Sequence, residues 1–235
     1  MARSITILDE AQRREFDRPP KFTYQQRKFF FTLPGWADDI RRELLTPHTQ
    51  LGFILQVGYF KMTGRFFSPK YFAATDADYV RRHWRLVGAD LDRYDGATIG
   101  RHRSLILANF GVTPFDEGQR VHTLEQATAY ARRQMNPVAV FRSTADYVRA
   151  HRIEVPTYAA LAGVVTQAFR LVETQISHQL HQYLTPAMQQ RLDALGEWDN
   201  NGPSQRKSDQ LQPPGAEPDT AATLWRYRLT RFKRP

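Results

Sequence analysis

The sequence predicts an all-α protein made of two small helical subdomains of the helix-turn-helix type, followed by a flexible linker. Apolar residues recur at the spacing of one helix face through most of the first 196 residues. Capping residues precede these stretches, glycine or proline follows them, and no stretch has the alternation of a convincing strand. We expect the first subdomain at 1–118, the second at 119–196, and the linker with the start of a downstream region at 197–235.

The first helices are separated by proline-containing turns. A short helical pattern from Asp9 to Asp17 is stopped by two prolines. An aromatic cluster closed by the Pro34-Gly35 turn precedes a helix expected from Trp36. Arg41 and Arg42 lie opposite the apolar residues of this helix, on the side that faces solvent.

The stretch Gln50–Phe67 is the most apolar run of the chain and predicts a buried helix that ends at Gly64. Gly58 lies on its apolar side, where the absence of a side chain permits close helix–helix contact. Lys61 and Arg65 come at the end of this helix, and we expect them to reach a phosphate backbone. The apolar positions at helical spacing are Leu51, Ile54, Leu55, Gly58 and Met62.

Residues 76–111 predict a helix-turn-helix unit. Asp76 or Asp78 is placed to cap its middle helix, and a turn after Gly88 leads into a helix from Thr98 to Gly111. The exposed N-terminal turns of that last helix are expected to carry Thr98, Arg101, His102 and Arg103.

The second subdomain is predicted to begin near Thr123, where the sequence TLEQ has the pattern of a capping box. A further helix is expected over Ser143–Ile153. The longest helix follows from Thr157 and carries one apolar stripe as far as Tyr183. A last helix is expected from Thr185 to Gly196, and the polar residues after it, rich in proline and glycine, are typical of a linker.

Composition indicates the class of partner. Lysine and arginine number 33 against 24 aspartate and glutamate, which gives a net charge of +9 and favours polyanions such as nucleic acid. The absence of cysteine excludes disulfides, iron–sulfur clusters and cysteine-based zinc sites. The N-terminal residues lack the apolar core of a signal peptide, and no run reaches transmembrane length. We therefore expect an intracellular protein without a membrane partner.

The sequence offers little for catalysis. His178 and His181 lie three residues apart on the longest expected helix, but no carboxylate or further histidine stands at metal-ligand spacing. A metal hydrolase built on this pair is therefore a remote alternative. No glycine-rich phosphate loop follows a strand, and neither a G-x-S-x-G motif nor a cysteine nucleophile is present. We expect no catalytic residue, no metal site and no cofactor in this chain.

Basic residues recur across several of the expected helices, which favours double-stranded DNA as the partner. A single basic pair is most often a solvated helix face, but many modest phosphate contacts sum to strong, salt-sensitive binding. Base recognition is assigned to Thr98, Arg101 and Arg103. The candidate DNA-binding residues are Arg41, Arg42, Lys61, Arg65, Lys70, Thr98, Arg101, His102, Arg103, Arg132, Arg133, Arg149 and Arg152.

An ordered set of motifs resembles the N-terminal region of Tn-three-type transposases, the large replicative transposases of bacterial transposons. The motifs are FFFTLPGW, TPHTQLGFILQVGYFKMTGRFF, DADYVRRH and RHRSLILANFGVTPFDE, followed by His151–Pro156 and Tyr227–Pro235. One departure occurs at Thr49-Gln50, where relatives often have Asn-Arg, so a contact made there by arginine is missing.

The resemblance implies sequence-specific binding to the terminal inverted repeats of a transposon by two helical DNA-binding subdomains. Full-length relatives dimerise and continue into an RNase H-like domain that uses magnesium and an Asp-Asp-Glu triad, which this chain does not reach. The chain is then expected to be a fragment, a truncated pseudogene product or one half of a split reading frame. Its location would be the bacterial cytoplasm, at the nucleoid.

A non-catalytic helical adaptor or regulatory protein is the alternative from a different class. In that hypothesis the long helix from Thr157 to Thr185 serves as the surface for a protein partner. A stripe of this kind more often packs inside its own domain, so DNA binding is the leading hypothesis.

Overall fold

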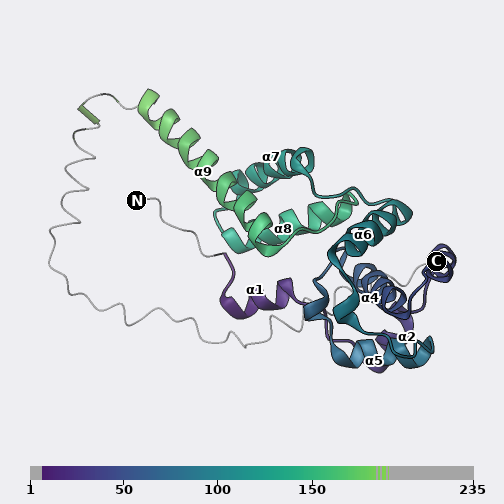
Figure 1. The fold of residues 1–235 in the computed structure, drawn as a ribbon. Helices are drawn as coiled ribbons and strands as arrows, with labels where there is room; N and C mark the ends of the chain where they lie inside the picture. Colours follow the sequence, from purple (N-terminus) through teal and green to yellow (C-terminus); the bar gives the residue numbers. More distant parts are fainter. Residues whose placement is uncertain (1–6, 184, 186, 189, 191–235) are drawn as a thin grey trace, which may run out of the picture. The chain divides into compact units, whose positions relative to one another are not determined.

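The computed structural model describes residues 7–183, 185, 187, 188 and 190, and in these residues the protein is all-α. Figure 1 shows the helices along the chain. The only strand-like pairing in the described part is an isolated parallel bridge between Thr113 and Ile153. The predicted fold class is therefore confirmed. None of the described helices is long and apolar enough to span a membrane.

Helix α4 (Pro47–Thr63) is the centre of the first half of the chain. Thr46 caps it, Pro47 occupies its first turn, and Gly64 ends it in the left-handed conformation at a φ of 70°. Every residue from Leu51 to Phe60 is buried, because the helix is surrounded by other elements. These elements are α2 (Tyr24–Phe30), α3 (Gly35–Glu43), α5 (Ala74–His83), α6 (Gly96–Phe110) and the 3-10 turn η2 (Leu91–Arg93).

Two hydrophobic clusters lie on the two sides of α4. Phe31, Tyr59 and Val80 belong to the cluster formed with α2 and α5. Phe53 and Ile106 belong to the cluster formed with α3 and α6. The most apolar run of the sequence is thus core on all sides, which is why its helix shows no single apolar face.

The second half of the chain has its own core. It is formed by α7 (Glu117–Arg133), α8 (Pro137–Ala150) and the first part of α9 (Tyr158–Tyr183). Helix α1 (Glu10–Asp17) packs here as well, although it comes first in the sequence. Its Phe16 meets the ring of Phe141 edge-on at 5.3 Å. The N-terminal segment therefore belongs to the later core.

The connection between α5 and α6 is longer than the turn of the helix-turn-helix motif that the sequence predicts here. A helix-turn-helix joins its helices by a turn of about three to four residues. Here residues 84–95 intervene and include η2, and both helices pack against α4. Helices α4, α5 and α6 thus form a three-helix arrangement in which α4 is the shared support.

Helix ends signalled by glycine are predicted well, and helix starts are predicted less well. The ends at Gly64 and Gly111 are confirmed, and both glycines have positive φ. Thr123 does not start a helix, because Asp116 caps α7 and Thr123 lies buried inside it. Neither Asp76 nor Asp78 caps α5, whose N-terminus carries no side-chain cap.

One helix was not expected from the sequence, and part of the prediction lies beyond the described residues. Helix α2 starts at a capping box in which Thr23 and Gln26 bond each other's backbone amides. The described residues up to Gln182 belong to one compact unit. The expected helix at 185–196 lies mostly outside the described residues, and the linker at 197–235 lies entirely outside them.

Candidate nucleic-acid interface

The outer face of α6 combines small side chains with one free arginine. Ala97, Gly100 and Ser104 are exposed on this face, and a methyl group built on Gly100 would meet no atom within 4 Å. Arg101 is exposed beside them, and its side chain has no hydrogen bond or ion pair with any residue that the structure describes. The sequence prediction of an exposed Arg101 is confirmed. This face can approach a flat or grooved anionic surface closely.

The N-terminal end of α6 is already occupied by a carboxylate. Asp95 caps the helix and accepts a 2.7 Å hydrogen bond from the Thr98 amide. Hydrogen bonds from the Thr98 amide and side chain lower the pKa of Asp95. Thr98 itself is half-buried. The end of the helix therefore cannot hold a phosphate without displacing its own cap, and a nucleic acid would have to lie along the side of α6.

Arg103 is engaged inside the protein. Its guanidinium binds both carboxylate oxygens of Glu154, with Nε 2.9 Å from Oε1. Glu154 is buried, and it also accepts a bond from the Phe115 amide. Arg103 thus ties α6 to the segment that leads into α9, and base recognition would require it to leave a bidentate ion pair.

His102 is not exposed, contrary to the sequence prediction. It lies on the same side of α6 as Ile106 and is completely buried. Its Nδ1 is 2.8 Å from the Tyr94 hydroxyl, and its ring meets Phe53 of α4 edge-on at 5.0 Å. Burial, with a smaller effect from the charge of Arg101, lowers the pKa of His102 to about 4. His102 is therefore a neutral core residue.

Acidification is expected to destabilise the protein through His102. The unfolded ring takes up a proton below its ordinary pKa of 6.5, whereas the folded ring stays neutral down to about 4. Above pH 6.5 His102 is neutral in both states and does not change the free energy of unfolding with pH. Between pH 6.5 and 4 only the unfolded ring gains a proton, so the free energy of unfolding falls by up to about 3 kcal/mol. Urea unfolding of the wild type and His102→Asn over this range measures the difference.

The exposed His151, which bonds only the Tyr147 carbonyl of its own helix, supplies the control. His151→Gln should keep the pH slope of the wild type, while His102→Asn should flatten it. Equal slopes for all three proteins would show that His102 takes up its proton in the folded state.

Arg65 is also buried, contrary to its predicted role at a phosphate backbone. Only 6 % of the residue is exposed, and its Nη2 lies 2.9 Å from Asp17 Oδ1. The guanidinium lies between the rings of Phe16 and Phe67, at 5.0 and 5.1 Å from their centroids. Burial lowers the pKa of Arg65. The residue joins α1 to the end of α4, and the two rings shield most of its guanidinium from solvent.

Several other predicted residues are held by neighbours on their own helices. Arg41 pairs with Asp38 and stacks over the Trp84 ring, and Arg42 pairs with the same carboxylate. Arg149 lies 3.1 Å from Asp146, and burial lowers its pKa. These arginines supply less free charge than the sequence suggests.

Lys61 forms a cap for another helix. Its ammonium donates to the carbonyl oxygens of Phe29 at 3.1 Å and Thr32 at 2.9 Å, just past the end of α2. Burial lowers its pKa. Two of its three donors are therefore used inside the protein.

The remaining predicted residues are exposed but do not share one element. Lys70 lies over the Tyr71 ring, and Arg132 donates to Gln175. Arg133 on α7 and Arg152 after α8 have no side-chain partner among the described residues. Arg65 and Arg103 are thus each paired with a carboxylate distant in the sequence, Asp17 and Glu154 respectively, where the two halves of the chain meet. The free cations are spread over the surface.

Sequence reasoning missed some exposed cations. Lys28, Arg93, Arg142 and Arg170 are exposed and lack side-chain partners within the described residues. A signal was available for Lys28: residues 18–37 contain four basic residues and no carboxylate.

In the described part of the chain, His178 and His181 do not belong to a cluster that could hold a metal ion. His178 and His181 are exposed on α9, and His181 Nδ1 lies 2.7 Å from the Ser177 carbonyl of its own helix. The described residues contain no cluster of three side chains suited to hold a metal ion.

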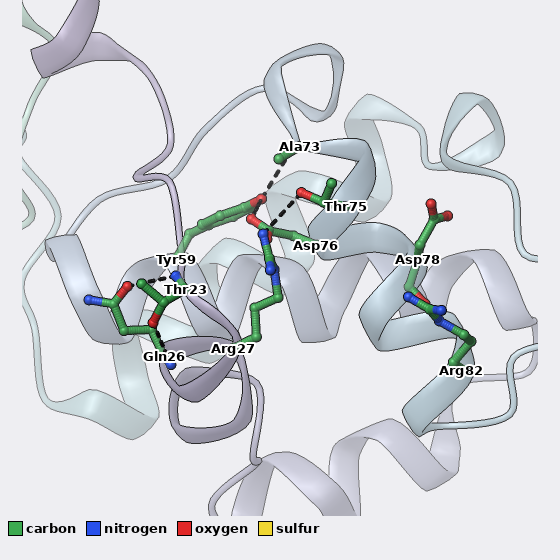
Figure 2. Close-up of polar contacts among 9 residues, drawn as sticks. All are labelled: Thr23, Gln26, Arg27, Tyr59, Ala73, Thr75, Asp76, Asp78 and Arg82. Carbon is green, nitrogen blue, oxygen red and sulfur yellow. Dashed lines mark hydrogen bonds and ion pairs between the residues drawn. The ribbon is translucent and has the colours of Figure 1, made fainter.

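A buried carboxylate near α2 has the residue types of a catalytic site but the contacts of a structural one. Asp76 is completely buried, with Oδ1 2.6 Å from Arg27 Nε and Oδ2 accepting from Tyr59 at 2.9 Å. Figure 2 shows these side chains converging, with Thr75 and the Ala73 amide completing the cluster. Burial, and then the charge of Asp76, raise the pKa of Tyr59. Each polar group is satisfied internally, so the cluster joins α2, α4 and α5.

Comparison with known proteins places the sequence of this chain in a family. No curated protein matches the chain. The sequence model of a family described as "Domain of unknown function (DUF4158)" matches residues 7–168. The matched region runs from just before α1 into the buried first part of α9, and so includes the core around α4 and all of the second core except Phe169 and Val172. The chain belongs to this DUF4158 family.

Proposed function

We propose that the chain binds double-stranded DNA along the outer face of α6, as the recognition part of a transposase that acts on terminal inverted repeats. The observation that carries this proposal is Arg101, an exposed and unpaired arginine on a helix face otherwise lined by Ala97, Gly100 and Ser104. The ordered motif resemblance to Tn-three-type transposases supports the same function.

The shape of this face supports groove binding. A major groove is about 12 Å wide and admits one α-helix. Small side chains let the helix backbone lie close to the base edges, and an arginine can then reach the O6 and N7 atoms of guanine with two hydrogen bonds. Because Asp95 occupies the N-terminal end of α6, the contact would run along the side of the helix.

Non-specific affinity would come from cations elsewhere on the surface. Lys70, Arg133 and Arg152 are exposed and form no ion pair within the described part of the chain, so they are available for phosphates. The net charge of +9 favours such contacts. In this proposal the chain itself is not catalytic and binds no cofactor. Magnesium binding, dimerisation and strand transfer are functions of other regions of full-length relatives. The proposed location is the bacterial cytoplasm.

Arg101→Ala is expected to lower affinity for the inverted-repeat duplex by about 5- to 100-fold, with a smaller effect on scrambled DNA of equal composition. The loss is selective because only the inverted repeat presents the recognised base in register with the other contacts of the helix, although scrambled DNA contains the same bases. Fluorescence anisotropy with both labelled duplexes over a salt series measures it.

Two matched arginines calibrate the experiment. Arg133→Ala should weaken both duplexes alike and reduce the salt slope by about one. Arg14→Ala should change neither, because Arg14 is exposed but paired with Glu10 on α1. Equal wild-type affinity for the two duplexes at every salt concentration would contradict sequence-specific recognition.

The adaptor hypothesis gains support from one feature of α9. The first part of its apolar stripe, through Val172, is buried, but Ile176, Leu180 and Tyr183 are 43 %, 52 % and 81 % exposed. Such a face suits a helical protein partner. A chain that binds neither duplex but forms a stable complex with another protein, lost on Leu180→Glu, would favour this second function.

A further inference from the structure

An open groove of about 610 Å³ lies at the end of α2. It is lined by Gln25, Lys28, Phe29 and Thr32, together with Leu33, Pro34 and, from α4, Lys61. No carboxylate lines it, and the nearest stretch of chain, residues 18–37, contains none. The groove is therefore positively charged through its two lysines and open to solvent.

An exposed aromatic ring stands in this groove. Phe29 is 64 % exposed, although the next two residues, Phe30 and Phe31, are buried against α4. Helical geometry explains the contrast, because Phe30 at the end of α2 and Phe31 just after it pack inward, whereas Gln25 and Phe29 share the outer face of the helix. The Phe29 ring touches Phe30 edge-on at 5.1 Å, which steadies it and leaves most of its surface in water.

Two lysines place positive charge beside the ring. Lys61 Nζ lies 5.4 Å from the centroid of Phe29 and is fixed there by its bonds to the Phe29 and Thr32 carbonyls. Lys28 is exposed and has no side-chain partner among the described residues. A fixed cation, a free cation and an exposed ring thus occur within one groove.

We propose that this groove binds an unpaired nucleobase of single-stranded DNA, with the base stacked on Phe29 and its phosphate beside Lys28 and Lys61. An exposed aromatic ring in a positively charged groove is the usual arrangement for binding single strands. The base must be unpaired, because stacking in a duplex covers both of its faces. Gln25 and Thr32 offer hydrogen-bonding groups at the rim, which suit base edges better than lipid chains. The inference rests on the proposed DNA binding for the class of ligand and extends it to a second form of DNA.

Phe29→Ala in the full chain is expected to lower affinity for a short labelled oligothymidine by about 5- to 150-fold, the range that loss of one stacked base produces. Phe29→Trp should retain the affinity, because the larger ring preserves stacking. Tyr71→Ala is the matched control: Tyr71 is a 46 % exposed ring beside Lys70 but lies outside the groove. Fluorescence anisotropy measures binding, and circular dichroism confirms that each variant is folded.

The same variants are measured on the inverted-repeat duplex and on anionic phosphatidylglycerol vesicles. Unchanged duplex affinity in Phe29→Ala, together with loss of oligothymidine binding, supports the inference. It is overturned if the wild type does not bind oligothymidine, if Phe29→Ala weakens duplex and single strand equally, or if only vesicle binding depends on Phe29. Failure of the proposed duplex recognition appears separately, as equal wild-type affinity for inverted-repeat and scrambled duplexes.

Discussion

Asp76→Ala is expected to lower the free energy of unfolding by about 3 to 5 kcal/mol, the range for removal of one partner from a buried ion pair. The variant leaves the Arg27 guanidinium, whose side chain is only 20 % exposed, without its carboxylate. It also removes the acceptor of the Tyr59 hydroxyl in the core. Urea unfolding followed by tryptophan fluorescence measures the change.

Asp78 provides the control from the same helix (Figure 2). Its carboxylate pairs with Arg81 one turn away and is 57 % exposed, so Asp78→Ala should cost less than about 1 kcal/mol. Asp76→Asn separates charge from shape, because an amide can still accept from Tyr59 but carries no charge for Arg27. We expect an intermediate loss. If Asp76→Ala costs no more than Asp78→Ala, the cluster does not hold α2, α4 and α5 together.

The helices were predictable because their signals are local. Gly64 and Gly111 end α4 and α6 with positive φ, a conformation that glycine adopts without strain. The capping box at Thr23 is an equally local signal for the start of α2. The helix was nevertheless not predicted, because the aromatic run after the box has no clear helical periodicity. The prediction that His102 is exposed was wrong because it did not consider which face of α6 packs inward. His102 lies one turn before Ile106, so both side chains are on the buried face of the helix.

The state of each arginine was not predictable in this way. Arg65 pairs with Asp17, 48 residues earlier in the chain, and Arg103 pairs with Glu154, 51 residues later. Such pairs depend on how the two halves of the chain meet, and no pattern around either arginine encodes that. Arg101 and Arg103 look alike in the sequence, yet only Arg101 is left without a partner among the described residues. The candidate interface therefore required the three-dimensional structure.

The difference between paired and unpaired arginines limits the surfaces at which an anionic partner can bind. The junction of the two halves already uses Arg65, Arg103 and Glu154, so neutralising these charges would affect folding before binding. The outer face of α6 and the groove beside α2 are among the surfaces that remain available. Both depend on α4, because every element that presents them packs against it.

Gly58→Ala is accordingly expected to destabilise the protein by about 3 kcal/mol, although alanine is the better helix former by about 1 kcal/mol. A methyl group at this position of α4 would lie 2.2 Å from the Phe31 ring, which is completely buried. The ring cannot move aside, because Phe22 and Tyr59 contact it edge-on. Thermal and urea unfolding of the variant measure the loss.

Gly163→Ala on α9 is the matched control, since a methyl group there meets no atom within 4 Å. It should raise the free energy of unfolding by about 0.5 to 1 kcal/mol through helix propensity alone. Phe31→Leu supplies the second test: Gly58→Ala should cost less in that background, because a smaller side chain leaves room for the methyl group. Equal costs in both backgrounds would mean that Phe31 is not what excludes a side chain at position 58. The close approach of α2 to α4 would then have to rest on other contacts, such as the Asp76 cluster and the bonds of Lys61 to the Phe29 and Thr32 carbonyls.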